Sequence, residues 1–247
     1  MTPRILIIAG SDSGGGAGIQ ADIKTVTMLG GHAMTAITAI TAQNTLGVSA
    51  VEVLSPELVE AQVRACIDDI GVDAIKIGML GSAAIAQRVA DLLETVTVSV
   101  VFDPVMVATS GSVLADAETI AAFDRLMARA TVVTPNLPEL EALGGLEAVL
   151  RAASAVLVKG GHGAGDTIID RLVTRAGEVA RWEGSRIATR HTHGTGCTLA
   201  SAIATGLGNG KPLPEAIGDA REFVRAALLA APGFGAGHGP MGHQAVL

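Results

Sequence analysis

The sequence predicts an α/β protein, a three-layer sandwich in which helices cover both faces of a mostly parallel central sheet. Apolar residues make up 49% of the 247 residues, whereas aromatic residues make up only 2%. Short aliphatic segments alternate along the chain with Ala-rich segments of helical periodicity. Such alternation implies right-handed crossovers between parallel strands that are buried on both faces.

The first third of the chain begins with an aliphatic strand at Arg4–Ala9, which leads into a Gly-rich turn at Gly10–Gly18. A helix is expected from Ile19 to Leu29, because Gly30-Gly31 then interrupts the helical spacing. Two strands and a helix with proline in its first turn follow, at Met34–Thr41, Ala50–Leu54 and Pro56–Ile70.

The middle of the chain repeats strand–helix units. Its expected helices lie at Ser82–Glu94, where the serine can cap the first turn, and at about Asp116–Ala128. A further short helix is expected to start in the segment Pro135–Pro138. The strands are predicted at Ala74–Ile77, Val98–Phe102, Thr131–Thr134 and Val156–Lys159.

The last third of the chain adds a small antiparallel extension. Asp166–Ile187 alternates polar and apolar residues, and Gly177-Glu178 marks a turn within it. Two helices follow, at about Thr195–Leu207 and Pro214–Ala230, and the Gly-rich tail is expected to be either an ordered loop or a frayed end. Because no linker divides the chain, we expect a single domain over residues 1–247.

Charge and hydropathy limit the partners of the protein. A net charge of −7 argues against nucleic acid and against anionic membranes as partners. No apolar run approaches the ~18 residues of a membrane span, and the N-terminus does not resemble a signal peptide. The only cysteines are Cys66 and Cys197, so a disulfide framework is not expected. These features predict a cytoplasmic protein.

The first Gly-rich segment, Gly10–Gly18, lies between a strand and a helix. It matches neither the spacing of a dinucleotide-binding loop nor that of a P-loop. The segment is therefore either a flexible connection or a ligand-binding loop of a less common kind, at the edge where open α/β sheets bind ligands.

The second Gly-rich segment, Thr192–Thr198, opens an Ala-rich helix. Backbone N–H groups at such a helix start can bind an anion. Cys197 lies in the first turn, where the pKa of a thiol is typically lowered. The alternative is a Gly-rich helix start with a buried cysteine, and the spacing does not decide between the two.

Polar residues follow three predicted strands. Asp103 ends one strand, Asn136 and Glu139 follow another, and Lys159 ends a third. One or two carboxylates together with substrate phosphates are what Mg²⁺ prefers, and a lysine there can meet a phosphate. Each residue alone is as well explained as a helix cap or a solvated charge. The six histidines lack the spacing of a zinc site.

Together these segments resemble the ribokinase-like superfamily, and within it the hydroxymethylpyrimidine/phosphomethylpyrimidine kinases of thiamine biosynthesis. The resemblance covers almost the whole chain. It is carried by seven segments in order, at 9–22, 38–45, 76–80, 103–106, 134–139, 158–162 and 192–198.

This resemblance implies an ATP- and Mg²⁺-dependent kinase that phosphorylates 4-amino-5-hydroxymethyl-2-methylpyrimidine and then its monophosphate, and it suggests a homodimer. By position, Gln43 would pair with the pyrimidine, and the same pocket would be lined by Asp22, Gly10, Met79, Val105 and Val107. The catalytic set would be Gly194, Gly196, Cys197 and Lys159. ATP would contact Lys159, Asn136, Thr195 and Gly196, and Mg²⁺ would be held through water by Asp103 and Glu139.

Two alternatives stay open at this point. Pyridoxal and pyridoxine kinases share the fold and act on a similar hydroxymethyl-bearing ring, although Gln43-Asn44-Thr45 and Met79 favour the pyrimidine. The other alternative is a non-catalytic protein of the same fold that binds a pyrimidine or a nucleotide. The combination of Cys197, Lys159, Asp103 and Glu139 disfavours it, because a binding protein needs no metal shell beside a reactive group.

Overall fold

The computed structural model describes residues 1–108, 111–163 and 165–246, and this part of the chain contains one nine-stranded sheet. The strands are β1 (Arg4–Asp12), β2 (His32–Gln43), β3 (Val48–Val53), β4 (Ala74–Ile77), β5 (Ser99–Phe102), β6 (Val132–Val133), β7 (Ala155–Val158), β8 (Thr167–Thr174) and β9 (Gly177–Ser185). The α-helices are α1 (Gly18–Met28), α2 (Pro56–Ala65), α3 (Ala83–Leu93), α4 (Ala117–Ala121), α5 (Phe123–Arg129), α6 (Leu137–Ala142), α7 (Leu146–Ala152), α8 (Thr195–Gly208) and α9 (Leu213–Leu229).

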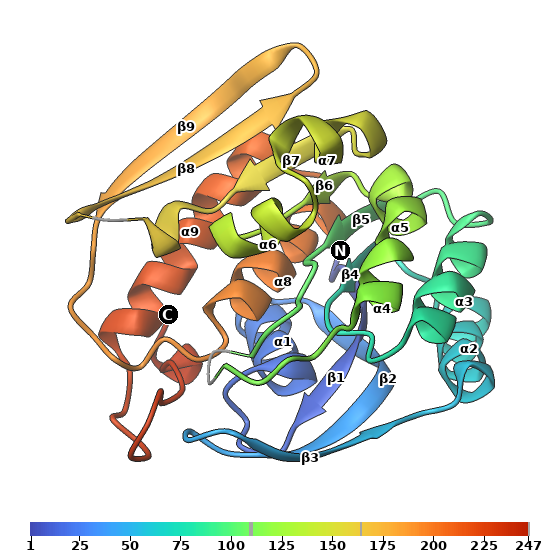
Figure 1. Cartoon of the computed structure of the whole chain (residues 1–247), viewed down its shortest axis with the longest axis horizontal. Coiled ribbons are helices and arrows are strands. Elements are labelled where there is room, and N and C mark those ends of the chain that lie inside the picture. The colour runs from blue at the N-terminus through green and yellow to red at the C-terminus, as the bar shows by residue number, and fades with distance from the viewer. Residues whose placement is uncertain (109–110, 164, 247) are drawn as a thin grey trace.

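The strands lie in the order β3-β2-β1-β4-β5-β6-β7-β8-β9. Six neighbouring strands, from β2 to β7, pair in parallel, which confirms the predicted mostly parallel sheet. The predicted antiparallel extension is the β8–β9 hairpin, which projects from the body of the molecule (Figure 1). Its turn is Arg175-Ala176 rather than Gly177-Glu178, because Gly177 already pairs with Thr174. β3 adds an antiparallel pair at the other edge.

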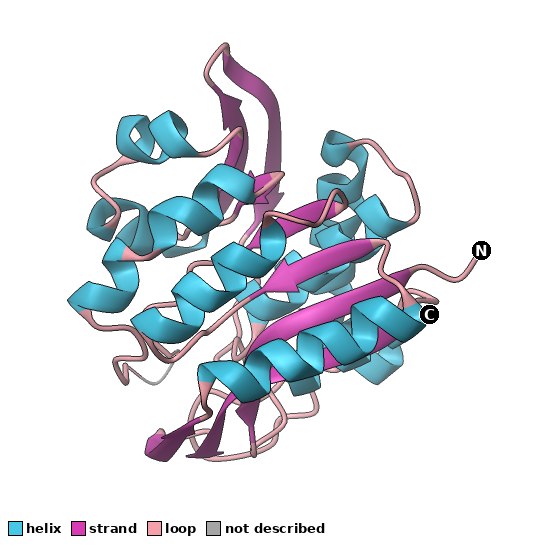
Figure 2. Cartoon of the chain, turned by 90° about the vertical axis from the view of Figure 1, so that its right-hand side faces the viewer, coloured by secondary structure: helices cyan, strands magenta, loops and turns pink. Residues whose placement is uncertain are grey.

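Side chains alternate along β1 between two cores, one on each face of the sheet. Ile5 and Ile7 pack with residues of α1, α8 and α9, whereas Leu6 and Ile8 pack with residues of α2, α3, α5 and α7. Figure 2 shows helices on both sides of the strands. The three-layer sandwich is therefore confirmed, and its aliphatic strands are buried on both faces as expected for a parallel sheet.

Several element boundaries differ from the prediction. β1 continues to Asp12 instead of ending at Ala9, because Ser11 and Asp12 pair with β2 after a shift in register. The helix expected at about Asp116–Ala128 is two short helices, α4 and α5, that meet at Ala122. Helix α7 had no predicted counterpart. The extension of β1 matters most for the site, because it makes the first residues of the predicted Gly10–Gly18 turn part of a strand.

The C-terminal tail is packed against the body, so the ordered loop is the correct one of the two expectations. Pro240 forms a bridge with His193, and the amide of Gly242 donates to the carbonyl of Ala227. The imidazole of His243 is buried, with Nε2 2.8 Å from Oγ1 of Thr198 in α8. In the described part of the chain, no helix combines the length and the apolar character that crossing a bilayer requires.

The buried His243 should make the tail sensitive to acid. Burial lowers the pKa of this imidazole from 6.5 to about 4, with a smaller contribution from the charge of Lys24. Because the unfolded chain binds this proton first, stability should be lost as the pH falls from about 6.5 towards 4. We expect a loss of about 2–3 kcal/mol at pH 4, since one pKa unit corresponds to about 1.4 kcal/mol. Urea unfolding from pH 7.5 to 4 checks this.

The matched variant is His243→Gln, which keeps a polar side chain but does not titrate. Its stability should fall less over the same pH range than that of the wild type, although both contain the same carboxylates. Parallel curves for the two proteins would contradict the assignment.

Candidate active site

Polar side chains gather where the parallel strands end. Because β2, β1, β4, β5, β6 and β7 are parallel neighbours, their carboxyl ends meet at one edge of the sheet. The start of α8 lies at this edge too, since Gly194 contacts the loop after β1 and Gly196 contacts Asp103. The residues found at or just beyond the strand ends are Asp12, Gln43, Met79, Asp103, Thr134 and Lys159.

Asp103 and Lys159 form the first half of the site. Nζ of Lys159 donates to Oδ1 of Asp103 at 2.9 Å, and the hydroxyl of Thr134 donates to the same oxygen at 2.9 Å. Burial opposes the charge on Lys159, but the carboxylates of Asp103 and Glu139 outweigh it and raise its pKa. A Cβ added to Gly196 would lie 3.3 Å from Oδ2 of Asp103 and 3.4 Å from Nζ of Lys159. The pair therefore sits directly against the first turn of α8.

Asn136 and Glu139 follow β6 and cap α6. The side chain of Asn136 accepts from the amide of Glu139, and Oε2 of Glu139 accepts from the amide of Asn136, both at 2.8 Å. Burial raises the pKa of Glu139 to about 7, and the carboxylate of Asp103 adds to the rise while Lys159 opposes it. Glu139 thus caps a helix and also belongs to a charged cluster.

This half of the site fits a Mg²⁺ ion that is held partly by protein carboxylates and partly by the oxygens of a bound phosphate. Asp103 uses Oδ1 for both hydrogen bonds, which leaves Oδ2 beside Gly196, and Glu139 uses Oε2 for its cap. Within the described ranges, no three His, Cys, Asp or Glu side chains come together in a way that would hold a metal on their own. One or two carboxylates with water and phosphate oxygens is the arrangement that Mg²⁺ commonly adopts.

Asp12 organises the other half of the site. Its carboxylate accepts hydrogen bonds from the amides of Gly14, Gly16 and Ala17 at 2.8–3.0 Å, so it shapes the loop before α1. The same carboxylate lies 2.9 Å from Nε2 of His193, in the second Gly-rich segment. Asp12 therefore ties together the two Gly-rich segments, which are far apart in the sequence.

The close packing of the two segments depends on Gly194. This residue is the N-cap of α8 and has a left-handed backbone with φ 86°. A Cβ there would lie 1.9 Å from the carbonyl oxygen of Gly16, so no side chain fits. Thr195 and Gly196 follow in the first turn, where backbone N–H groups lack partners inside the helix. The sequence prediction of an anion-binding turn is compatible with this geometry.

Cys197 has the opposite pKa shift to the one expected. Burial raises the pKa of the thiol to about 11, and the carboxylates of Asp22 and Asp103 add to this effect. Lys76 and a hydrogen bond from the amide of Gly18 oppose it without cancelling it. The position at the helix start does not lower the pKa, because removal from water and two nearby carboxylates both disfavour a thiolate.

Asp22 does not face an open pocket. Its side chain is fully buried, with Nζ of Lys76 2.8 Å from Oδ2 and the hydroxyl of Ser201 2.7 Å from Oδ1. Lys76 is fully buried as well. The predicted contact of Asp22 with a substrate therefore needs correction, since both of its oxygens are used inside the protein. Asp22 stabilises the site through buried contacts that join α1, β4 and α8.

The remaining predicted residues lie in two places. One group, Gln43, Gly10 and Met79, lies near the ends of neighbouring strands, and the other, Val105 and Val107, lies on a loop. Gln43 ends β2 and lies against His193, with Nε2 of Gln43 3.2 Å from Nε2 of the imidazole. Gly10 lies in β1, where a Cβ would be 2.7 Å from the sulfur of Met79. Val105 and Val107 lie on the loop after Asp103, where Val107 bridges to Val113 and stays half exposed. Among the described residues, no hydrogen bond or bridge joins these two valines to Gln43.

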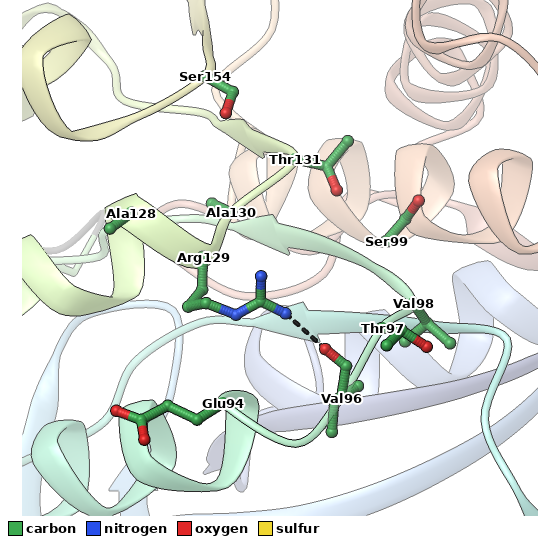
Figure 3. Close-up of a pocket in the computed structure, with 10 residues that line it drawn as sticks. All are labelled: Glu94, Val96, Thr97, Val98, Ser99, Ala128, Arg129, Ala130, Thr131 and Ser154. Atoms are coloured by element: carbon green, nitrogen blue, oxygen red, sulfur yellow. Dashed lines mark hydrogen bonds between the residues drawn. The ribbon is translucent and has the colours of Figure 1, made fainter.

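A surface cavity of about 740 Å³ lies away from this site. It is lined by residues at the amino ends of the strands, including Ser99, Thr131 and Ser154, as Figure 3 shows. The guanidinium of Arg129 in this cavity donates to the carbonyls of Leu93 and Val96. Its hydrogen bonds thus serve the protein backbone, and we place the chemistry at the carboxyl edge instead.

Sequence reasoning missed Asp12, His193, Thr134 and the Lys76–Asp22 pair. Asp12 gives the same signal as Asp103, an acidic residue at the end of a parallel strand, but the strand was predicted to stop at Ala9. Lys76 is a charge in the middle of a short aliphatic strand, and such a charge requires a buried partner. That rule was available from the sequence, but the identity of the partner was not.

Comparison with protein families gives one match over nearly the whole chain. The model described as phosphomethylpyrimidine kinase matches residues 12–242. The chain is 47% identical to a hydroxymethylpyrimidine/phosphomethylpyrimidine kinase of Rhizobium meliloti, over 98% of this chain and 97% of that one. It is 46% identical to a protein of the same name from Streptomyces coelicolor, over 98% and 94% of the two chains. It is also 46% identical, over 97% of its length, to a thiamine biosynthesis bifunctional protein of Geobacter sulfurreducens, of which it covers 52%.

Solved structures show the same fold. An ADP complex of Bacillus subtilis pyridoxal kinase has a TM-score of 0.89 and 33% identity, and the match covers 100% of this chain and 99% of the other. A Staphylococcus aureus pyridoxal kinase in complex with AMP-PCP and pyridoxal has a TM-score of 0.88 and 33% identity, with 100% and 95% of the chains covered. Both of these proteins were solved with an adenine nucleotide bound.

Proposed function

Because the chain belongs to the phosphomethylpyrimidine kinase family, we propose that it transfers a phosphoryl group from ATP to 4-amino-5-hydroxymethyl-2-methylpyrimidine and then to the monophosphate. The chain is an ATP-dependent kinase of thiamine biosynthesis. The observation that carries the proposal is the meeting of the Lys159–Asp103 pair with the start of α8. Phosphoryl transfer needs little covalent help, so a cation and a turn of helix amides held against each other supply most of what it requires.

The roles of the residues follow from their places around this turn. The amides of Gly196 and Cys197 would bind the migrating phosphoryl group, and Lys159 would bind the phosphates of ATP, with Thr195 beside them. Asn136 lies next to Lys159 through a parallel bridge, which supports a role for it on the ATP side. Gln43, Gly10 and Met79 would form the pyrimidine side, with Val105 and Val107 on the loop beside it.

Mg²⁺ would be held by Asp103 and Glu139 through water, where it would neutralise charge on the phosphates. Burial raises the pKa of Glu139 to about 7, and a bound cation would favour its ionised form. Until then Glu139 titrates close to neutrality, and Lys159 supplies the positive charge of the cluster.

Pyridoxal kinase is the second candidate, because the two solved structures compared above carry that name. Identity to the pyrimidine kinases is higher, at 46–47% against 33%. The test is ADP release in the presence of Mg²⁺-ATP and, in separate assays, the pyrimidine, its monophosphate, pyridoxal and pyridoxine. We expect the highest kcat/KM with the pyrimidine and clear turnover of its monophosphate. Higher kcat/KM for pyridoxal would reverse the assignment.

Cys197 should act mainly in the first of the two transfers. An alcohol must lose its proton, whereas a phosphate monoester with a second pKa of about 6 is already ionised near neutrality. Since the thiol has a pKa of about 11 in the ligand-free protein, a base role makes the first step rise by about tenfold per pH unit between pH 7 and 9. Single-turnover rates with the pyrimidine and with its monophosphate measure this.

Cys197→Ser provides the matched variant, since a hydroxyl has the shape of the thiol but does not ionise in this range. The tenfold rise of the first step per pH unit should disappear in the variant, while the second step should respond to pH in the same way in both proteins. A wild-type first step that is independent of pH would rule out the base role and leave the thiol as a wall of the pocket.

We further propose that two copies associate through the β2–β3 edge of the sheet. Exposed apolar residues gather there, namely Ile40, Leu46, Val51 and Val53. β3 is the last strand of the sheet, and within the described residues no other strand pairs with its outer side. Sedimentation equilibrium should give twice the chain mass of 24.8 kDa. A single kinase domain over residues 1–247 and a cytoplasmic location remain predictions of the sequence.

A further inference from the structure

His193 lies between a carboxylate and an amide that belong to different strands. Its Nε2 is 2.9 Å from Oδ2 of Asp12 and 3.2 Å from the side-chain amide of Gln43. Both Asp12 and His193 are buried, and the imidazole packs on Gly16, where a Cβ would be 2.4 Å from Cδ2. One nitrogen atom thus contacts both a buried acid and the residue that faces the substrate.

The hydrogen bonds of Asp12 determine whether the proton between Asp12 and His193 is carried by the carboxylate or by Nε2 of the imidazole. Its oxygens already accept from the amides of Gly14, Gly16 and Ala17. Burial opposes ionisation of Asp12, but the hydrogen bonds from His193 and from the amides of Ala17 and Gly14 outweigh it and lower its pKa. An ionised carboxylate only accepts hydrogen bonds. Nε2 of His193 must therefore be the protonated nitrogen.

This requirement fixes the direction of the Gln43 amide. An NH₂ group beside the protonated Nε2 would set two donors against each other, so the carbonyl oxygen of Gln43 belongs on that side, since its two amide positions are interchangeable in shape. There it accepts the longer branch of a three-centre hydrogen bond, whose single Nε2–H proton is shared with Asp12. On the other side, Oγ1 of Thr41 is 3.1 Å from the amide and gives its single proton to the carbonyl of Ser11 at 2.9 Å. Thr41 is left as an acceptor there, so the NH₂ of Gln43 faces it.

We propose that Asp12 and His193 are positioning residues that hold the Gln43 amide in one of its two orientations and thereby select an amidine edge in the substrate. The inference rests on the proposed function, because it takes Gln43 as the residue that meets the ring. After the bonds to His193 and Thr41, the amide keeps one N–H and one lone pair for a ligand. A 4-aminopyrimidine offers the complementary pair, a ring nitrogen next to an exocyclic amino group.

When the Gln43 amide is held in one orientation, it selects the kind of ring that binds and also the orientation of that ring. If the amide turned over, its donor and acceptor would exchange places, and the ring would have to turn with it to keep both bonds. Its hydroxymethyl group would then point away from the turn at the start of α8. Pyridoxine has no amino group next to its ring nitrogen, so it gains little from this arrangement.

A double-mutant cycle between His193 and Gln43 tests the proposal. His193→Phe keeps a ring on Gly16 but removes the N–H group. We expect it to raise KM for the pyrimidine by about tenfold, as for the loss of one net hydrogen bond, and to leave KM for ATP unchanged. In a Gln43→Ala background the same change should have no further effect, because its target is gone. His193→Gln, which can still donate to Asp12, should recover most of the loss.

The proposal is overturned if His193→Phe raises both KM values together, or if its effect is equally large without Gln43. Two-bond ¹H–¹⁵N spectra of the wild type at pH 8 provide a test that needs no variant. Nε2 of His193 should be protonated, and an unprotonated Nε2 would contradict the arrangement. Wild-type protein that never phosphorylates the pyrimidine would remove the proposed function, while the spectra would still report on the Asp12–His193 pair by themselves.

Discussion

Replacing Gly194 by Ala should reduce kcat by at least about 10²–10³-fold while leaving a folded protein. The new Cβ would lie 1.9 Å from the carbonyl oxygen of Gly16, and the backbone would have to keep φ 86° with a side chain present. The left-handed conformation alone costs about 1–2 kcal/mol, and the overlap forces the two Gly-rich segments apart. Displaced amides at the start of α8 no longer stabilise the transferred phosphoryl group, and loss of one such donor has an effect of this size.

Gly47→Ala is the matched control. Gly47 also lies outside helices, but an added Cβ there has nothing within 4 Å, and its φ is not in the left-handed region. Its kcat and melting temperature should stay close to those of the wild type. Steady-state kinetics together with circular dichroism distinguish a misplaced turn from an unfolded chain. If Gly194→Ala kept full activity, the turn would have no part in the transfer.

Removing the carboxylate of Asp22 should destabilise the protein by about 3–5 kcal/mol, because the fully buried Lys76 would lose its partner. Burial opposes a charge on Lys76, but nearby acidic groups outweigh it and raise its pKa, Asp22 foremost and then Cys197 and Asp103. Asp22→Ala leaves an ammonium without that partner between α1, β4 and α8. Urea unfolding near pH 7.5 gives the change in free energy.

The double variant Asp22→Leu/Lys76→Met separates the cost of an unpaired charge from the value of the pair. An apolar replacement of similar volume is often neutral, so the double variant should be more stable than Asp22→Ala. Glu215→Ala, which breaks the exposed contact with Lys211, should unfold like the wild type. A double variant no more stable than Asp22→Ala would mean that the pair itself, rather than charge compensation, holds these three elements together.

Much of the fold could be predicted from the sequence, because buried strands can be recognised from short runs of aliphatic residues. Short aliphatic segments such as Ala74–Ile77 were placed correctly to the residue, because their length and the flanking Asp73 and Gly78 are typical of a buried strand. Boundaries failed where pairing, not composition, extends an element. Gly10, Ser11 and Asp12 look like a loop, but Ser11 and Asp12 pair with Ile40 and Thr41 of β2 and so extend the strand past Gly10, where the register shifts.

The candidate site divides in the same way. From the sequence alone, Asp103, Glu139, Lys159 and the turn at Gly194–Cys197 could be named, because strand ends and helix starts are visible as local patterns. Only the tertiary structure decided that Asp22 is buried, that burial raises the pKa of the Cys197 thiol, and that His193 joins Asp12 to Gln43. These properties depend on distances between residues up to 181 positions apart and on the exclusion of water. A local pattern determines which groups are present, and packing decides which of them meet.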